Sequence, residues 1–154
     1  MTRVSLGRGG PDEGQIGILV IGLFALVLLL VAGTIDVTAA QLARMRLLDA
    51  ADSIALDAAD ALDERAAYEE GLPDRLVLTD ASVADAASGH LARTPRPAGV
   101  SAWAVVPQTG TPDGETAVVT LTGRAELPMT GWALEGIGGG VTITVTSRAR
   151  APLR

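Results

Sequence analysis

The stretch IGILVIGLFALVLLLVAGTI, from Ile16 to Ile35, decides the fold of this chain. It carries no charged residue and is about 20 residues long, so a helix over it would span about 30 Å, the thickness of the hydrocarbon core of a bilayer. The sequence therefore predicts a transmembrane helix over residues 16–35. This prediction argues against a soluble enzyme. The function must therefore suit a short tail, a membrane helix and a modest downstream domain.

Composition limits the rest of the chain to one small domain. Of the 154 residues, roughly 115 remain once the first 40 or so are assigned to the membrane. The absence of cysteine excludes disulfides and thiolate chemistry. A net charge of −6 argues against a general role in binding nucleic acid.

A cleaved secretory signal is the rival interpretation of the apolar run. Thr38, Ala39 and Ala40 have the small side chains of a signal peptidase site, and cleavage there would release a secreted domain. However, the run is longer than the apolar region of a usual signal, and Asp12 and Glu13 stand where a signal carries positive charge. We therefore expect an uncleaved anchor, with the cleaved signal as the alternative.

Helical periodicity continues beyond the expected membrane surface. From Asp36 to about Glu70 there is neither proline nor glycine, and Gly71 and Pro73 then give a stop signal. An apolar stripe at helical spacing is predicted for Leu48, Ala51, Ala55, Ala58 and Leu62. The sequence thus predicts a disordered tail over residues 1–15 and one nearly continuous helix over residues 16–70. Residues 36–70 form its part outside the membrane, and the alanine stripe requires a closely packed partner.

The remaining residues, 71–154, are predicted to form a small α+β domain. Thr79 is a plausible N-cap for a short helix from Asp80 to about Arg93. Three strands are expected, and a helical turn is expected around Trp132 to Leu134; the strands are Val100 to Val106, Thr116 to Leu127 and Val141 to Ala149. The fold class is therefore α+β, with three antiparallel strands laid on the long helix.

These residues resemble a known family. The segment DEGQIG before the apolar run, TIDV at its end and the extension QLARMRLLDAADSIALDAADAL resemble the TadE/TadG-like proteins of Flp (Tad) pilus assembly, over about Pro11 to Leu62. The resemblance is closest to the TadG-related N-terminal membrane segment. It implies a non-enzymatic, pseudopilin-like protein held in the cell membrane by one helix, with its C-terminal domain outside the cytoplasm and other pilus subunits as partners.

The resemblance also implies a processing site, with one departure. Members of the TadE type resemble prepilins, which are cleaved after a glycine and carry glutamate at the fifth mature position. Here Gly14 matches the glycine and Gln15 would be the first mature residue, but the fifth is Leu19. A TadG-like anchor fits this departure better than a cleaved pseudopilin does.

Three residues near the end of the run are candidates for contacts. Asp36 either pairs with a positive charge of a neighbouring subunit or simply marks the water interface. Arg44 and Arg46 either meet lipid headgroups or are ordinarily solvated. Positive charge does not choose an orientation, because Arg3 and Arg8 before the helix balance these two arginines after it.

No motif predicts catalysis, a metal or a cofactor. Asp80 and Ser82 resemble part of a metal-adhesion motif, but Ala84 replaces its last serine, and a helix N-terminus explains the pair better. His90 is the single histidine and has no nucleophile pattern near it. We therefore expect membrane lipid and other subunits as partners, and neither nucleic acid nor a small-molecule substrate. A membrane-tethered extracytoplasmic binding module unrelated to pili is the alternative function.

Overall fold

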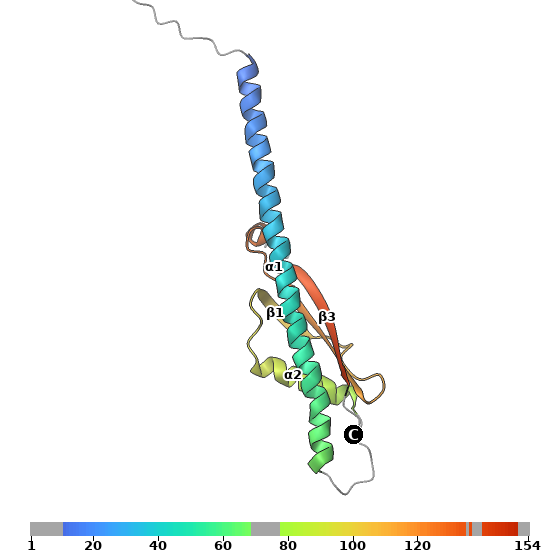
Figure 1. Ribbon diagram of the computed structural model, residues 1–154. Helices are drawn as coiled ribbons and strands as arrows, with labels where there is room; N and C mark the ends of the chain where they lie inside the picture. The colour runs from blue at the N-terminus through green and yellow to red at the C-terminus, as the bar shows by residue number, and fades with distance from the viewer. Residues whose placement is uncertain (1–10, 69–77, 135, 137–139, 151–154) are drawn as a thin grey trace, which may run out of the picture.

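The chain forms a rod with a small head wrapped on its C-terminal half (Figure 1). The computed structural model describes residues 11–68, 78–134, 136 and 140–150. Helix α1 (Pro11–Tyr68) is the rod, and α2 (Asp80–Arg93), β1 (Val100–Val105), β2 (Thr116–Ala125), α3 (Gly131–Leu134) and β3 (Val141–Arg150) form the head. The predicted α+β fold class is confirmed.

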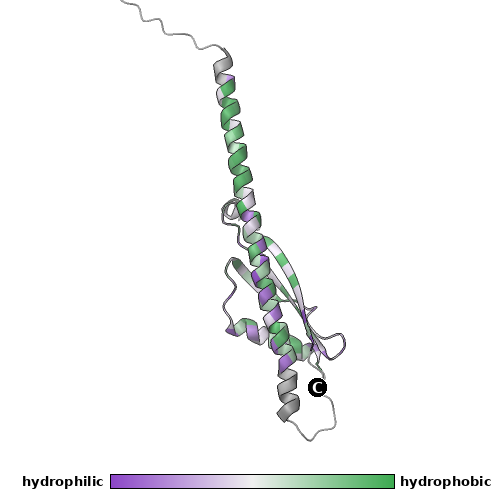
Figure 2. Ribbon diagram, viewed as in Figure 1, coloured by the Kyte–Doolittle hydropathy of each residue, from purple (hydrophilic) through white to green (hydrophobic). Residues whose placement is uncertain are grey.

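Helix α1 is 58 residues long, so it extends about 87 Å at 1.5 Å per residue. It begins at Pro11, a residue that suits the first turn because its missing N–H has no helical acceptor there. Its apolar half projects beyond the head, as Figure 2 shows. The large apolar side chains from Ile16 to Val31 are each 47 to 74% exposed. None of these side chains is therefore covered by the part of the chain that the structure describes.

The second half of α1 is amphipathic, and its buried face lies on the sheet. Seven of its side chains are at most 3% exposed: Ala43, Leu47, Ala51, Ile54, Ala55, Ala58 and Ala59. The predicted stripe was right for three alanines and wrong for Leu48, which is 39% exposed while its neighbour Leu47 is fully buried. A shift of one residue turns a side chain by about 100° around a helix, so Leu47 and Leu48 cannot share the face.

Helix α2 forms as predicted and packs against α1 and the sheet. The Thr79 hydroxyl accepts a hydrogen bond from the backbone N–H of Ser82 at 3.1 Å, and the Ser82 hydroxyl oxygen accepts one from the N–H of Thr79 at 3.1 Å. This reciprocal capping box satisfies two N–H groups at the helix start and explains the Asp80 and Ser82 pattern without a metal. Val83 and Ala87 enter the core.

The sheet is a meander in the order β1-β2-β3 with antiparallel neighbours. The register of β2 with β3 runs without interruption from the pair of Thr116 with Arg150 to the pair of Ala125 with Val141. The alternation along β2 places Ala117, Val119 and Leu121 in the core against α1. The three predicted strands and their order along the chain are therefore confirmed, with ends that differ by one or two residues.

Gly123 allows α1 to approach the sheet closely. A Cβ atom at this position would lie 3.0 Å from Leu47 Cδ2 and 3.1 Å from Val100 Cγ1. Both neighbours belong to the packed interior, so there is no free space into which they could move. The close contact of Leu47 with the sheet depends on this missing side chain.

Parts of four predictions lie outside the described residues. They are residues 1–10 of the expected tail, residues 69–70 of the expected helix, and the stop signal at Gly71 and Pro73. The side chain of Leu62, the last member of the predicted stripe, also lies outside what the structure describes.

Candidate functional site

The end of the apolar run is fastened to the head through one carboxylate. Asp36 Oδ1 accepts a hydrogen bond from the backbone N–H of Met129 at 2.8 Å. Its Oδ2 accepts two more, from the N–H of Thr130 at 2.9 Å and from the Thr130 hydroxyl at 2.5 Å. Asp36 is only 5% exposed, so these three donors replace the water that the carboxylate gives up.

Local bonds in the segment after β2 present these donors to Asp36. The N–H of Gly131 donates to the carbonyl of Leu127 at 3.0 Å, and the N–H of Leu134 donates to that of Thr130 at 3.2 Å, which forms the short α3 turn. The helical turn predicted around Trp132 to Leu134 is thus confirmed. The N–H groups of Met129 and Thr130 are left pointing toward α1 and meet the carboxylate.

The contact explains Asp36 in a way that neither sequence interpretation included. It is buried by a segment of its own chain, and its partners among the described residues are the neutral donors of that segment. No sequence pattern pointed to Met129 or Thr130, because they lie 93 and 94 residues away from Asp36. Pairing of Asp36 with a charge of another subunit stays a prediction.

The two arginines beyond Asp36 have different surroundings. Arg46 is half-buried, and its Nη1 donates to the carbonyl oxygen of Ala98 at 2.8 Å, which ties α1 to the segment before β1. Arg44 is exposed and lines a shallow hollow between α1 and the start of β3. Contact of either arginine with lipid headgroups stays a prediction.

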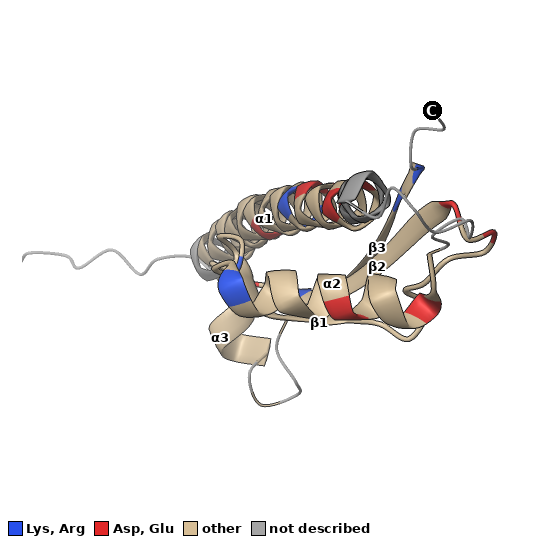
Figure 3. Cartoon of the chain, turned by 90° about the horizontal axis from the view of Figure 1, so that it is seen from below, with Lys and Arg blue, Asp and Glu red and all other residues tan. Residues whose placement is uncertain are grey.

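A second surface lies on the side of α1 that faces away from the sheet. We call it the outer face of α1 and define it by four exposed apolar side chains: Leu42 (44% exposed), Met45 (65%), Leu48 (39%) and Leu56 (57%). Asp49 and Asp52 lie among them. Figure 3, which views the head from below, shows acidic and basic residues both present along this part of α1. The outer face is thus a mixed surface that the head does not cover.

The end of the head farthest from the apolar run is held by polar contacts. Asp113 accepts hydrogen bonds from the N–H groups of Glu115 at 2.9 Å and Thr116 at 2.7 Å, and from the Thr116 hydroxyl at 2.8 Å. These bonds, with a smaller contribution from the charge of Arg150, hold the pKa of Asp113 below its usual value. Arg150 donates to Glu115 Oε2 at 2.7 Å, and this bond raises the pKa of Arg150. The group fixes the turn that starts β2 against the end of β3.

One side-chain contact joins the two longer helices. Asp57 on α1 and His90 on α2 lie 3.1 Å apart, between Oδ2 and Nδ1, with side chains 67% and 20% exposed. Asp80 accepts a hydrogen bond from the N–H of Thr111 at 2.7 Å. Within the described part of the chain no three His, Cys, Asp or Glu side chains gather as a metal ion would require. His90 and Asp80 therefore have structural partners.

The predicted processing site lies in the first turns of α1. Gly14 and Gln15 both have helical backbone, continuous with the apolar run. Within the described residues, α1 is the one helix long and apolar enough to cross a membrane, and none of its most apolar window is buried. A helix of the length and hydropathy that a membrane span requires is thus present, as predicted.

Comparison with known proteins agrees with the sequence resemblance. Residues 14–61 match the model of a family described as putative Flp pilus-assembly TadE/G-like. The matched segment covers the apolar half of α1, Asp36 and the buried face, and ends before α2 and the sheet. No curated protein and no solved structure shows a significant match.

Proposed function

We propose that this chain, which is TadE/G-like over residues 14–61, is a single-pass, membrane-anchored, pseudopilin-like component of a Flp-type pilus assembly or secretion system. It acts by packing its helix against partner subunits and not as an enzyme. One observation carries the proposal: a single continuous helix is bare and apolar in its first half and covered by a head in its second. The family match supports the assignment to pilus assembly. The exposed apolar half of the helix supports membrane anchoring.

The bare half of α1 requires an apolar environment. Each large apolar side chain left in water forgoes about 1.5–3 kcal/mol of burial free energy, and the segment has more than a dozen of them. Thr34, the hydroxyl residue near its end, donates to the carbonyl of Leu30 at 2.9 Å, so its polar group is satisfied within the helix. Lipid meets this requirement before assembly, and the helices of other subunits meet it afterwards.

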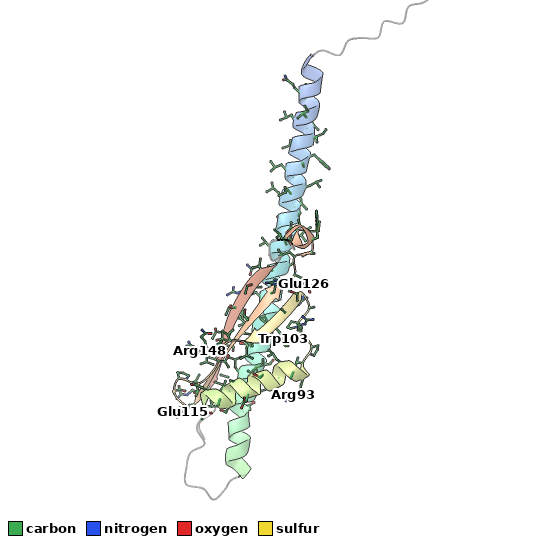
Figure 4. All side chains as sticks on the ribbon, turned by 180° about the vertical axis from the view of Figure 1, so that it is seen from behind. Arg93, Trp103, Glu115, Glu126 and Arg148 are labelled. Carbon is green, nitrogen blue, oxygen red and sulfur yellow. The ribbon has the colours of Figure 1, made fainter. Side chains whose placement is uncertain are left out.

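The outer face of α1 is the surface that we assign to partner subunits. The alanine stripe does not serve this purpose, because the chain's own sheet covers it. The outer face continues the uncovered side of the rod from the membrane into the head region, and Figure 4 shows the side chains of the bare half projecting into open space. A neighbouring helix could thus follow α1 beyond the membrane surface.

We place the head on the extracytoplasmic side and the N-terminus in the cytoplasm, as the family resemblance implies. The departure at Leu19 favours an intact N-terminus, with Gln15 as the first residue if processing does occur. Membrane lipid is then the first partner, and pilus-assembly subunits are the second.

The mass of the full-length protein extracted from membranes tests the anchor. An intact chain, or one that begins at Gln15, supports a membrane-held subunit; a chain that begins at Gln41 in the medium contradicts it and supports a secreted domain. Protease treatment of intact cells tests the orientation, since digestion of the region around Trp103 is expected for an outward head.

Site-specific cross-linking tests the pilus role itself. A photoreactive residue at Met45 or Leu56 of the full chain in its native cells should yield adducts with other pilus-assembly proteins. The matched control is Ser88 on α2, which is also exposed but lies away from the outer face. Adducts from Ser88 alone, with none from the outer face, would contradict helix packing and favour a tethered binding module.

A further inference from the structure

We infer that the segment from Met129 to Trp132 is a second membrane contact, which rests in the headgroup layer and holds the head at a fixed height on the bilayer. The occupant is the lipid surface itself. The inference rests on the proposed membrane anchor. It adds a site in the head, where Met129 lies 93 positions after Asp36, outside both the family match and the apolar run.

Position is the first argument. The three hydrogen bonds to Asp36 hold Met129 and Thr130 against the helix one residue after Ile35, the last residue of the apolar run. One residue is a rise of about 1.5 Å. In Figures 1 and 2 the α3 turn lies beside α1 where the apolar half meets the head. When the run spans a bilayer, this segment therefore lies at its surface.

Exposure is the second argument. Trp132 is 77% exposed and Met129 is 44% exposed, although both are large apolar side chains. On α1 the two neighbours of Asp36 are also bare, with Ile35 41% and Val37 63% exposed. These four side chains, which we call the α3 patch, lie next to Asp36 on α1 or on the segment that is hydrogen-bonded to it, at the end of the apolar run. Their exposure at this level of the helix indicates the same apolar environment for the patch and the run.

The chemistry of Trp132 is the third argument. Its indole N–H donates to the carbonyl oxygen of Met129 at 2.9 Å, so the polar atom of the ring is satisfied within the chain. Tryptophan is enriched at membrane interfaces because a flat apolar ring with one polar edge suits the headgroup layer. The exposed Glu126 nearby limits how deeply the α3 patch enters the bilayer, because moving a carboxylate into hydrocarbon is costly. The α3 patch thus sits at the headgroups and does not enter the hydrocarbon core.

Depth-dependent fluorescence quenching tests this placement on the full-length chain in phosphatidylcholine vesicles. In a Trp103→Phe variant, Trp132 is the remaining tryptophan. We expect a blue-shifted emission, and about twofold or stronger quenching by a spin-labelled lipid with its label near the glycerol backbone than by one labelled near the chain end. The matched control is Trp132→Phe, in which the half-buried Trp103 of β1 is the remaining tryptophan. Trp103 lies in the head farther from the apolar run, so both spin-labelled lipids should quench it weakly.

A third variant separates failure of the contact from failure of the anchor. Phe24→Trp in a background of Trp103→Phe and Trp132→Phe reports from the middle of the apolar run, and deep quenching of its indole shows that the helix is inserted. If that indole is quenched while Trp132 remains open to aqueous iodide and untouched by spin-labelled lipid, the second contact is overturned and the anchor stands. If neither is quenched, the proposed anchor fails and the inference fails with it.

A photoreactive residue at position 132 in native membranes distinguishes lipid from a protein occupant. Lipid adducts support the inference. Adducts with one protein and none with lipid overturn it and assign the α3 patch to a subunit interface.

Discussion

The carboxylate of Asp36 accepts a 2.5 Å hydrogen bond from the hydroxyl of Thr130, a residue 94 positions away along the chain. With the N–H groups of Met129 and Thr130, this bond joins the end of the apolar run to the loop between β2 and β3. The head is therefore fastened to α1 at the end of the apolar run as well as along the buried alanine face. Rotation of the head relative to the apolar half of α1 is restricted at both places.

Asp36→Ala is expected to loosen this end of the head. It leaves two backbone N–H groups and one hydroxyl of part-buried hydrogen bonds without an acceptor, and such groups are costly where water replaces the partner poorly. We expect the thermal midpoint of the micelle-embedded protein to fall by several degrees, with faster proteolysis between Leu127 and Leu134. Asp49→Ala, which removes an exposed carboxylate from the same helix, is the control and should leave both measurements unchanged. Equal effects of the two substitutions would contradict the fastening role.

Gly123→Ala should push α1 away from the sheet. The new methyl group would lie 3.0 Å from Leu47 Cδ2 and 3.3 Å from the carbonyl oxygen of Ala102. Overpacking of this kind costs about 1–3 kcal/mol of the free energy of unfolding. Leu47→Ala alone should cost about 2–5 kcal/mol through the cavity it leaves. The double variant should cost less than the sum of the two, because each change relieves the other, and simple additivity in denaturant titrations would contradict the proposed contact.

The lowered pKa of Asp113 predicts that the protein loses stability in acid. Its pKa in the folded state lies below the ordinary value of 3.8, so its stabilising contribution is complete above that pH and is lost as the pH falls through the folded-state pKa. Asp113→Asn should therefore be less stable than the wild type at neutral pH, and the difference should shrink below about pH 4. Thermal melts across this range measure it. Asp52→Asn, on the exposed side of α1, is the control, and a difference for Asp113→Asn that grew in acid would show the sign to be wrong.

Leu56→Asp tests the outer face of α1 without disturbing the fold. Leu56 is 57% exposed and lies outside the core, so the free energy of unfolding should change by no more than about 0.5 kcal/mol. If this face packs on partner subunits, the charge should sharply reduce co-purification of other pilus proteins and surface piliation seen by electron microscopy. Ser88→Asp on α2 adds the same charge elsewhere and should retain both. Normal piliation with Leu56→Asp would assign the packing to another surface.

Local pattern was enough for the elements of the fold. The length of the charge-free run predicts a helix long enough to span a membrane. The Thr79 cap sets the start of α2 through bonds that span three residues. Period-two alternation places β2 because each side chain in a strand faces opposite to the next. In each case the deciding interactions lie within one element or next to it.

The same kind of pattern did not choose which face of α1 is buried. Leu47 and Leu48 are identical and adjacent, and an alanine stripe is compatible with either one. The choice depends on the space above Gly123, where Leu47 fits because β2 has no side chain at that point. That space exists only once the sheet has formed.

The sequence by itself determined an apolar run long enough to span a membrane, a helix that continues beyond it, and three strands that follow. Only the tertiary structure decided that Asp36 is buried beneath Thr130, that the alanine face is covered by the chain's own sheet and that Trp132 stands bare near the end of the apolar run. Helices, caps and strands arise from neighbours a few residues apart. These relationships instead join residues far apart in the chain, 94 positions apart for Asp36 and Thr130, and no short-range periodicity encodes the closing of such a loop.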